Sequence, residues 1–231
     1  MDKKSGVDSP PLKKGEISPE AKWGISLSKI IPEERIKTRY IDLVSYGADA
    51  GFYFLLPKAV VKPVSEKEIT QLFDYSHEHK VPLVFRTGGT SLSGQSITDG
   101  ILVDLSQYWN KLTIENNAEH VRVQPGITGA MVNAYLNKYK KKIGPDPSSI
   151  TAAMMGGILS NNSSGMCCGV SLNAYHTTQF IRFILPDGKT YSTEIKADFR
   201  RFEEECPVIF NELKSIREEI LANPALFSRI R

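Results

Sequence analysis

The sequence contains few cysteines and no C-x-x-C pair, and these absences exclude several classes of site. Only three of the 231 residues are cysteines, namely Cys167, Cys168 and Cys206. An odd number with two adjacent thiols is a poor disulfide framework, so we expect three reduced thiols. Zinc and iron–sulfur sites usually need C-x-x-C spacing, so we expect no metal site within this chain.

A large excess of charge and a long apolar run are also absent. The 29 basic and 26 acidic side chains give a net charge of +3, which does not indicate nucleic-acid binding. Residues 1–22 combine lysines with prolines and predict a disordered polar tail. Neither a signal-peptide core nor a membrane span is apparent. The sequence therefore predicts a cytoplasmic protein, and it leaves peripheral association with the inner membrane open.

The first half of the chain predicts a helical segment followed by a βαβ unit. The segment is expected over residues 23–54, with a helix over 28–43. Residues 59–63 and 81–85 are short apolar runs that are typical of strands. Between them, Ser65 and Glu68 form a capping box that opens a helix ending near His79. This order requires parallel strands and a right-handed crossover.

The second half predicts antiparallel pairs and further helices. Thr128 is expected to cap a helix that reaches Tyr139 and turns Met131, Tyr135 and Leu136 inward. Further helices are expected from residue 198 onward. Strands are expected over residues 101–105, 112–115, 120–124, 180–185 and 189–193, with hairpins joining the second to the third and the fourth to the fifth. We therefore expect one lobe over residues 55–111 and a larger, mainly antiparallel lobe over 112–231.

Residues 86–96 form a loop rich in small side chains, directly after an apolar strand. Ligands usually bind at the carboxyl ends of strands in such folds. Gly88 and Gly89 allow a sharp turn that aligns N–H groups for an anion, and Thr90, Ser91, Ser93 and Ser96 add hydroxyl groups. The loop matches neither the P-loop nor the G-x-G-x-x-G pattern. The residue types alone favour an anion site and a flexible surface loop equally.

A second segment of this kind follows at residues 144–165. Two prolines stiffen residues 144–149, and the stretch after them is dense in small residues. Such a backbone can pack closely against a flat ligand, and Asn161 and Asn162 can hydrogen-bond to carbonyl groups and ring nitrogens. The alternative is a tightly packed turn and helix without a ligand. Two such segments in succession favour a shared binding site.

These segments occur in the order and spacing of the FAD-linked oxidase family, which is typified by vanillyl-alcohol oxidase and p-cresol methylhydroxylase. The chain resembles this family over about residues 40–231, and most closely its D-2-hydroxyacid dehydrogenases. The resemblance implies an α+β, two-lobed FAD-binding domain with FAD between the lobes. Residues 161–166 also resemble large bacterial members that carry an iron–sulfur domain. The matching segments are residues 59–63, 86–94, 103–106, 123–126, 145–149 and 156–157.

The resemblance also implies roles for individual residues. Some relatives attach FAD through a histidine in the first loop, and Thr90 stands there in this chain, so non-covalent FAD is expected. The four histidines are more typical of surface or packing positions; the alternative is that His176, Cys167 or Cys168 lies near the flavin. The expected FAD-binding residues are Arg86, Thr87, Gly88, Gly89, Thr90, Ser91, Gly94 and Gln95 at the phosphates, Pro145, Asp146, Ser148, Ser149, Gly156, Gly157, Asn161 and Gly165 along the flavin, and Ile184 on the adenine side.

By the same resemblance, the flavin would oxidise a small D-2-hydroxy acid to the 2-oxo acid by accepting a hydride. The family's substrate residues lie in a C-terminal cap domain. We therefore expect this chain to be the N-terminal portion of a longer enzyme, and we nominate no catalytic base. The resemblance suggests an electron acceptor or an iron–sulfur domain as partner. The alternatives are a sugar or alditol oxidase, a cell-wall-precursor reductase of the same fold, and a non-catalytic nucleotide-binding module.

Overall fold

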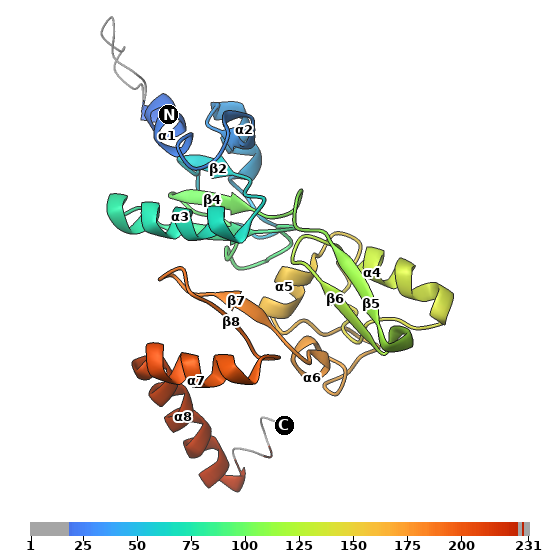
Figure 1. The fold of residues 1–231 in the computed structure, drawn as a ribbon. Helices are drawn as coiled ribbons and strands as arrows, with labels where there is room; N and C mark the ends of the chain where they lie inside the picture. Colours follow the sequence, from blue (N-terminus) through green and yellow to red (C-terminus); the bar gives the residue numbers. More distant parts are fainter. Residues whose placement is uncertain (1–18, 226–227, 229–231) are drawn as a thin grey trace, which may run out of the picture. The chain divides into compact units, whose positions relative to one another are not determined.

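The computed structural model of the protein describes residues 19–225 and residue 228 (Figure 1). The chain divides into two units, Met1–Thr177 and Thr178–Arg231, which are described separately below. Most of the predicted N-terminal tail lies outside the described residues. Its last four residues, 19–22, belong instead to helix α1 (Pro19–Leu27).

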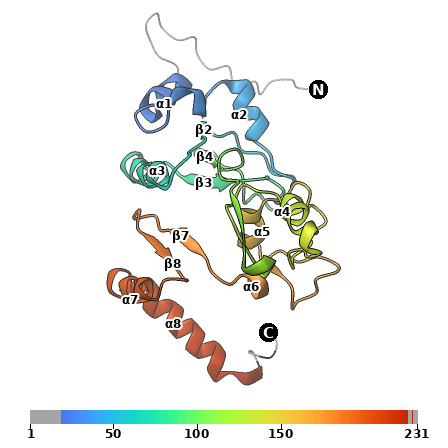
Figure 2. The ribbon, with the colours of Figure 1, turned by 45° about the vertical axis from the view of Figure 1, so that its right-hand side comes forward.

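The first unit is built on a four-stranded sheet in the order β1-β2-β4-β3 (Figure 2). Strands β2 (Ala59–Val61), β4 (Ile101–Asp104) and β3 (Leu83–Arg86) are parallel, and β1 (Ile36–Lys37) pairs antiparallel with β2. The predicted βαβ unit is present as β2, α3 (Glu66–His79) and β3, but β4 lies between its two strands. Every residue of β4 is buried, as its central place requires.

Helices cover both faces of this sheet. Val60 and Leu102 cluster with Leu43 of α2 (Tyr40–Tyr46). On the other face, the ring of Phe85 lies 5.7 Å from that of Phe73 in α3. Because successive side chains of a strand point to opposite faces, α2 and α3 pack on opposite sides of the strands (Figure 2).

The predicted helix over residues 28–43 is wrong. The structure has a turn after α1, a 3-10 turn η1 (Glu33–Arg35), strand β1 and the start of α2 in its place. Pro32 lies before the turn in an extended conformation, with φ −53° and ψ 142°, and Ile36 pairs with Val61 of the sheet. Pairing with β2 therefore outweighs the local helical pattern, which is a weak preference.

The predicted capping box at the start of α3 is confirmed in part. The Ser65 Oγ accepts a hydrogen bond from the Glu68 N–H at 3.3 Å. The Glu68 carboxylate does not return to Ser65; it accepts from the Val64 N–H at 2.8 Å. Each of its oxygens also lies 2.8 Å from the Arg35 guanidinium. The start of α3 is thereby fixed to the segment that leads into β1.

Strands β5 (Leu112–Glu115) and β6 (His120–Val123) form the predicted antiparallel hairpin, and α4 (Gly129–Leu136) packs on it. Thr128 caps α4 as predicted, because its Oγ1 accepts from the Met131 N–H at 3.2 Å. The predicted inward face is only partly right. Leu136 is buried, whereas Met131 and Tyr135 are 50% and 52% exposed, and Val132 is buried in their place. Apolar residues lie on more than one face of α4, so the spacing of apolar residues did not show which face is buried.

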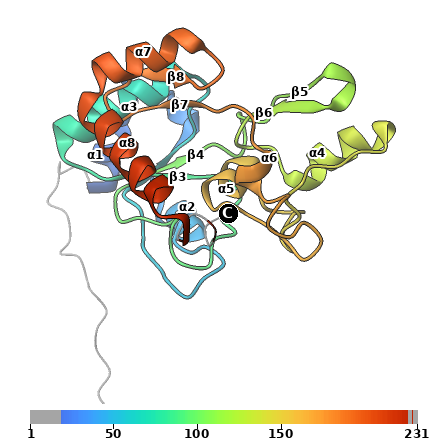
Figure 3. The same cartoon turned by 90° about the horizontal axis from the view of Figure 1, so that it is seen from below.

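After α4 the first unit continues with η3 (Asn137–Tyr139), α5 (Met155–Ser160) and α6 (Ala174–Thr177). The second unit contains the predicted hairpin of β7 (Arg182–Ile184) and β8 (Thr190–Ser192), followed by α7 (Lys196–Glu205) and α8 (Pro207–Ala222) (Figure 3). Within the described residues, the antiparallel strands of the predicted second lobe therefore form two separate pairs.

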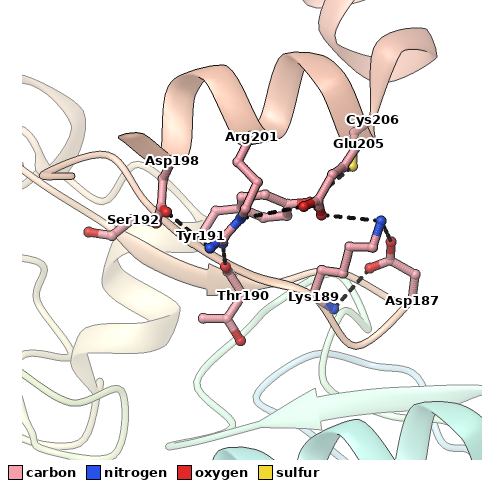
Figure 4. Close-up of polar contacts among 9 residues, drawn as sticks. All are labelled: Asp187, Lys189, Thr190, Tyr191, Ser192, Asp198, Arg201, Glu205 and Cys206. Carbon is pink, nitrogen blue, oxygen red and sulfur yellow. Dashed lines mark hydrogen bonds and ion pairs between the residues drawn. The ribbon is translucent and has the colours of Figure 1, made fainter. Parts of the chain in front are cut away.

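Tyr191 of β8 is buried in the second unit and contacts residues at the end of α7 (Figure 4). It is 1% exposed, and its ring lies 5.1 Å from that of Phe202. Its hydroxyl donates to Glu205 Oε2 at 2.9 Å, and Lys189 Nζ lies 3.2 Å from the same oxygen. Burial, with the Cys206 thiol and the Glu205 carboxylate beside it, raises the pKa of the Tyr191 hydroxyl, which therefore remains a donor.

Candidate functional site

A cavity of about 570 Å³ lies within the first unit, at the carboxyl end of β3. Phe85 and Arg86 from the end of β3, and Leu105 directly after β4, line one part of it. The loop after β3, Pro125, and residues between 149 and 163, which include most of α5, line the rest. This is the edge of a parallel sheet at which ligands usually bind.

The structure brings together residues from both predicted loops. Ten of the predicted cofactor-binding residues line the cavity: Arg86, Thr87, Gly89, Thr90, Ser91, Gln95, Ser149, Gly156, Gly157 and Asn161. Six others, Gly88, Gly94, Pro145, Asp146, Ser148 and Gly165, belong to the same unit but do not line the cavity. Ile184 belongs to the second unit. The binding role of all of these residues stays a prediction.

Some of the predicted glycines allow close packing between backbone segments. A Cβ atom on Gly88 would collide with the carbonyl oxygen of Ala152, and one on Gly156 would lie 2.7 Å from the Cβ of Pro125. The Gly156 N–H donates to the Pro125 carbonyl at 2.9 Å. The start of α5 is thereby held against the turn that follows β6. The density of small residues thus reflects contact between loops as well as room for a ligand.

The first loop needs glycine at two turning points. Gly89 and Gly94 have φ values of +63° and +77°, in the left-handed region that other residues avoid. Between them, the side chains of Thr90, Ser91 and Ser93 line the cavity. The loop therefore presents hydroxyl groups from a backbone whose course depends on glycine.

Ser96 is a buried polar residue of the cavity lining. Its residue is 9% exposed and lines the cavity, yet its Oγ has no hydrogen-bond partner within the protein. A buried hydroxyl without a partner costs about 1–3 kcal/mol, so a ligand that supplies one is favoured. Among the described residues no carboxylate lines the cavity, and Arg86 is its one cationic side chain. These features fit an anionic group such as a pyrophosphate.

Eleven residues outside the predicted cofactor-binding set also line the cavity, and seven of them are apolar. The predicted set omitted Phe85, Leu92, Ser93, Ser96, Leu105, Pro125, Ala153, Met154, Ile158, Ser160 and Ser163, which also line the cavity. Leu105 and Pro125 each follow the end of a strand. That position is the sequence signal by which they could have been found. A lining that combines hydroxyl-bearing and apolar residues suits a molecule with a charged part and a flat ring.

The histidines and cysteines do not line this cavity. His176 Nδ1 lies 2.8 Å from Asn173 Oδ1, and the buried Cys168 Sγ accepts from the Gly165 N–H at 2.9 Å. Cys167 is exposed, and all three cysteines are free. In the part of the chain that the structure describes, no cluster of His, Cys, Asp or Glu side chains could hold a metal ion. Nor is any described helix both long and apolar enough to span a bilayer.

The parallel sheet with a glycine- and hydroxyl-rich loop at its carboxyl edge defines a nucleotide-cofactor-binding domain. The sequence profile of the FAD binding domain matches residues 57–194. The chain belongs to this family of FAD binding domains.

Curated relatives of known name share the matched region. The chain is 36% identical to D-2-hydroxyglutarate dehydrogenase of Pantoea ananatis over 133 residues, which are 55% of this chain and 13% of that protein. It is 28% identical to glycolate oxidase subunit GlcD of Escherichia coli K12 over 62% of this chain and 30% of the relative. It is also 28% identical to the mitochondrial D-lactate dehydrogenase [cytochrome] of Arabidopsis thaliana, over 80% of this chain and 33% of that protein. The chain thus spans a third or less of the length of these relatives.

Solved structures confirm the predicted fold class. Alkyldihydroxyacetonephosphate synthase aligns with a TM-score of 0.64 and 19% identity, over 83% of this chain and 36% of that one. p-Cresol methylhydroxylase aligns with a TM-score of 0.62 and 17% identity, over 79% of this chain and 37% of that one. The chain has the α+β FAD-binding fold of p-cresol methylhydroxylase.

Proposed function

We propose that the chain is the FAD-binding portion of a flavin-dependent oxidoreductase that oxidises a D-2-hydroxy acid to the 2-oxo acid. Its membership of the FAD binding domain family and the names of its relatives, which act on D-2-hydroxyglutarate, D-lactate or glycolate, support this proposal. The observation that carries it is the cavity, with its hydroxyl-lined loop and the unpartnered Ser96 hydroxyl. When bound, FAD supplies the hydride acceptor.

The residues of this chain bind and orient the cofactor in this proposal. The loop over residues 87–96 holds the pyrophosphate, and residues 149–161 form the wall along the flavin. Thr90 has no ring nitrogen through which the flavin could be attached, so we propose non-covalent FAD. Among the described residues, no histidine, lysine or carboxylate lines the cavity, and we assign no proton-transfer step to it. The electron acceptor, an iron–sulfur partner and a cytoplasmic location stay predictions.

Titration of the purified chain with FAD tests the cofactor. We expect saturable binding with a shifted flavin spectrum, and full release of the flavin on acid denaturation. Ser96→Ala should weaken binding about 5- to 10-fold, because one hydrogen bond of about 1 kcal/mol is lost. It should leave the Tm unchanged or raised, because the hydroxyl has no partner in the free protein.

Thr98→Val is the matched control. Thr98 is also buried, but its Oγ1 accepts from the Gly100 N–H at 2.9 Å. This variant should lower the Tm and leave FAD affinity nearly unchanged. Failure of the wild-type chain to bind FAD would overturn the proposal. In a polypeptide as long as the relatives, anaerobic flavin reduction by D-2-hydroxyglutarate, D-lactate or glycolate tests the substrate class.

A further inference from the structure

Arg86 stands at the base of the loop assigned to the pyrophosphate, yet its guanidinium faces carbonyl groups of the protein. Nη1 lies 2.8 Å from the carbonyl oxygen of Ala48, 3.2 Å from that of Tyr46 and 3.4 Å from that of Ser96. A Cβ atom on Gly89 would collide with the same guanidinium. The loop is therefore wrapped around Arg86 and is joined through it to the end of α2.

Arg86 also contacts Tyr46, which belongs to a polar cluster with Asp104 and Lys62 at the edge of the sheet. The ring of Tyr46 has the Arg86 guanidinium carbon 5.6 Å from its centroid, and its hydroxyl donates to Asp104 Oδ2 at 2.8 Å. Asp104 is 2% exposed, lies opposite Arg86 in the β3–β4 pairing, and has Lys62 Nζ at 3.5 Å. Burial, with the negative Asp104 beside it, raises the pKa of Tyr46 and keeps its hydroxyl a donor. Because this cluster holds the Tyr46 ring in place, the ring in turn helps to fix the position of the Arg86 guanidinium.

A second set of contacts joins the same two segments farther along the loop. Asp49 Oδ2 accepts from the Gly94 N–H at 3.0 Å, and its Oδ1 accepts from the Gly51 N–H at 2.7 Å. The Ala50 N–H donates to the Ser91 carbonyl at 2.9 Å. A Cβ on Gly51 would lie 2.5 Å from the Leu92 carbonyl oxygen, so the two backbones are in direct contact.

We propose that residues 46–51 brace the phosphate loop, with Asp49 and Arg86 as positioning residues. This segment precedes the matched family region, which begins at residue 57. Ordering a flexible backbone costs about 1–2 kcal/mol per residue. A loop held in place before binding avoids that cost when the cofactor arrives. In its effect on FAD this inference rests on the proposed function.

Substitution of Asp49 distinguishes a bracing role from a purely electrostatic effect on FAD binding. FAD is an anion, so removal of a nearby carboxylate should tighten binding if charge alone decides. If Asp49 braces the loop, the same change weakens binding, because the Gly94 and Gly51 N–H groups lose their acceptor. The two explanations therefore predict opposite changes in Kd for Asp49→Ala.

The experiment measures the Kd for FAD and the amide hydrogen exchange of the FAD-free protein. For Asp49→Ala and for Gly51→Ala, which changes no charge, we expect at least a tenfold higher Kd. Exchange in residues 87–97 should be faster in both variants. Asp42→Ala removes a partly exposed carboxylate of α2 that pairs with Arg39, and it should leave both quantities within twofold.

For Arg86→Met we expect faster exchange in residues 87–97 and weaker FAD binding. The slope of log Kd against log salt concentration should not change. If Arg86 bound a phosphate directly, its removal would make this slope smaller. Unchanged or tighter FAD binding by Asp49→Ala, with exchange as in the wild type, would overturn the brace. If the wild type does not bind FAD but Asp49→Ala and Gly51→Ala still exchange faster, the brace stands and the proposed cofactor fails.

Discussion

At the residue scale, Gly88 and Gly157 have different surroundings although both belong to the predicted cofactor site. A methyl group on Gly88 would meet the carbonyl oxygen of Ala152, which belongs to a backbone segment that cannot move aside without displacing the second loop. A methyl group on Gly157 would have only Thr87 Oγ1 nearby, at 3.7 Å. Gly88 therefore serves the contact between the loops, and Gly157 borders open space.

This contrast predicts different effects of the same substitution. Gly88→Ala should lower the free energy of unfolding by about 1–3 kcal/mol, the usual cost of overpacking. Gly157→Ala lies within α5 and should leave it unchanged or raise it by up to about 1 kcal/mol, because alanine favours a helix over glycine. Urea denaturation of the FAD-free proteins measures both. Equal stability of the two variants would contradict the packing role of Gly88.

The sequence indicated that small residues gather at the site, but not what each of them contacts. Gly88 and Ala152 are distant in the chain, and their contact depends on how the two loops fold together. Ser96 was recognised as a hydroxyl of the first loop, but its lack of a partner is visible only in the folded protein. Local composition predicts a loop, whereas contacts across the fold decide the role of each residue in it.

At the scale of elements, the Glu68 carboxylate joins the start of α3 to two other segments. Glu68 binds the Val64 N–H and the Arg35 guanidinium, and 14% of its side chain is exposed. The hydrogen-bonded Arg35, together with the Val64 N–H, holds the pKa of Glu68 below its usual range. The unfolded chain therefore takes up this proton at a higher pH than the folded protein does.

We expect Glu68→Gln to lower the free energy of unfolding by about 1–3 kcal/mol at pH 7. The stabilisation by Glu68 is complete above its unfolded pKa of about 4.3 and is lost as the pH falls through the lower folded pKa. The difference between variant and wild type should therefore shrink below about pH 4. Denaturation at several pH values measures it, with Glu78→Gln at the exposed end of α3 as control. A difference that does not vary with pH would exclude this ion pair as the cause.

The elements of the first unit show where the sequence pattern suffices. The capping residues and apolar spacing of α3 are local, and the helix was predicted with its cap. The segment over residues 28–43 has an equally helical pattern, yet it contributes a strand to the sheet and Arg35 to the pair with Glu68. Both partners lie far along the chain, so the sequence pattern near Ile36 contains no sign of them.

At the scale of the whole molecule, the matched family region continues beyond the boundary between the units. It reaches residue 194, whereas the first unit ends at Thr177. The predicted adenine contact Ile184 is thus in the second unit, in strand β7. Among the described residues, those that line the cavity all belong to the first unit.

The predicted role of Ile184 has a direct test. Ile184→Ser should raise the Kd for FAD about 3- to 10-fold through loss of apolar contact, and it should leave the Kd for FMN unchanged, because FMN has no adenine. Isothermal titration with the two cofactors measures the difference. Ile181→Ser, at an exposed position of the same segment, is the control. Equal effects on FAD and FMN would show that Ile184 acts through folding and not through adenine.

The parallel strands and both hairpins followed from apolar runs and turn residues, which are local features, whereas the α+β class was implied by the resemblance to a known family. The strand order did not, because the pattern placed β2 and β3 as neighbours in one βαβ unit. The continuous burial of β4, on both faces, decides its central place. The central position of β4 depends on how all the strands pair with one another, and no local sequence pattern contains that information.

This strand order also has a consequence for the newly made chain. Strand β4 lies between β2 and β3 but follows both in the sequence. During synthesis β2 and β3 therefore emerge before the strand that lies between them, and the edges at which they pair with β4 are open to other chains until it arrives. The segment from residue 87 to 100 becomes a closed loop only when β4 inserts. The ribosome must therefore release β4 before this loop can close, and the cavity is complete only after residues 149–163 have also emerged.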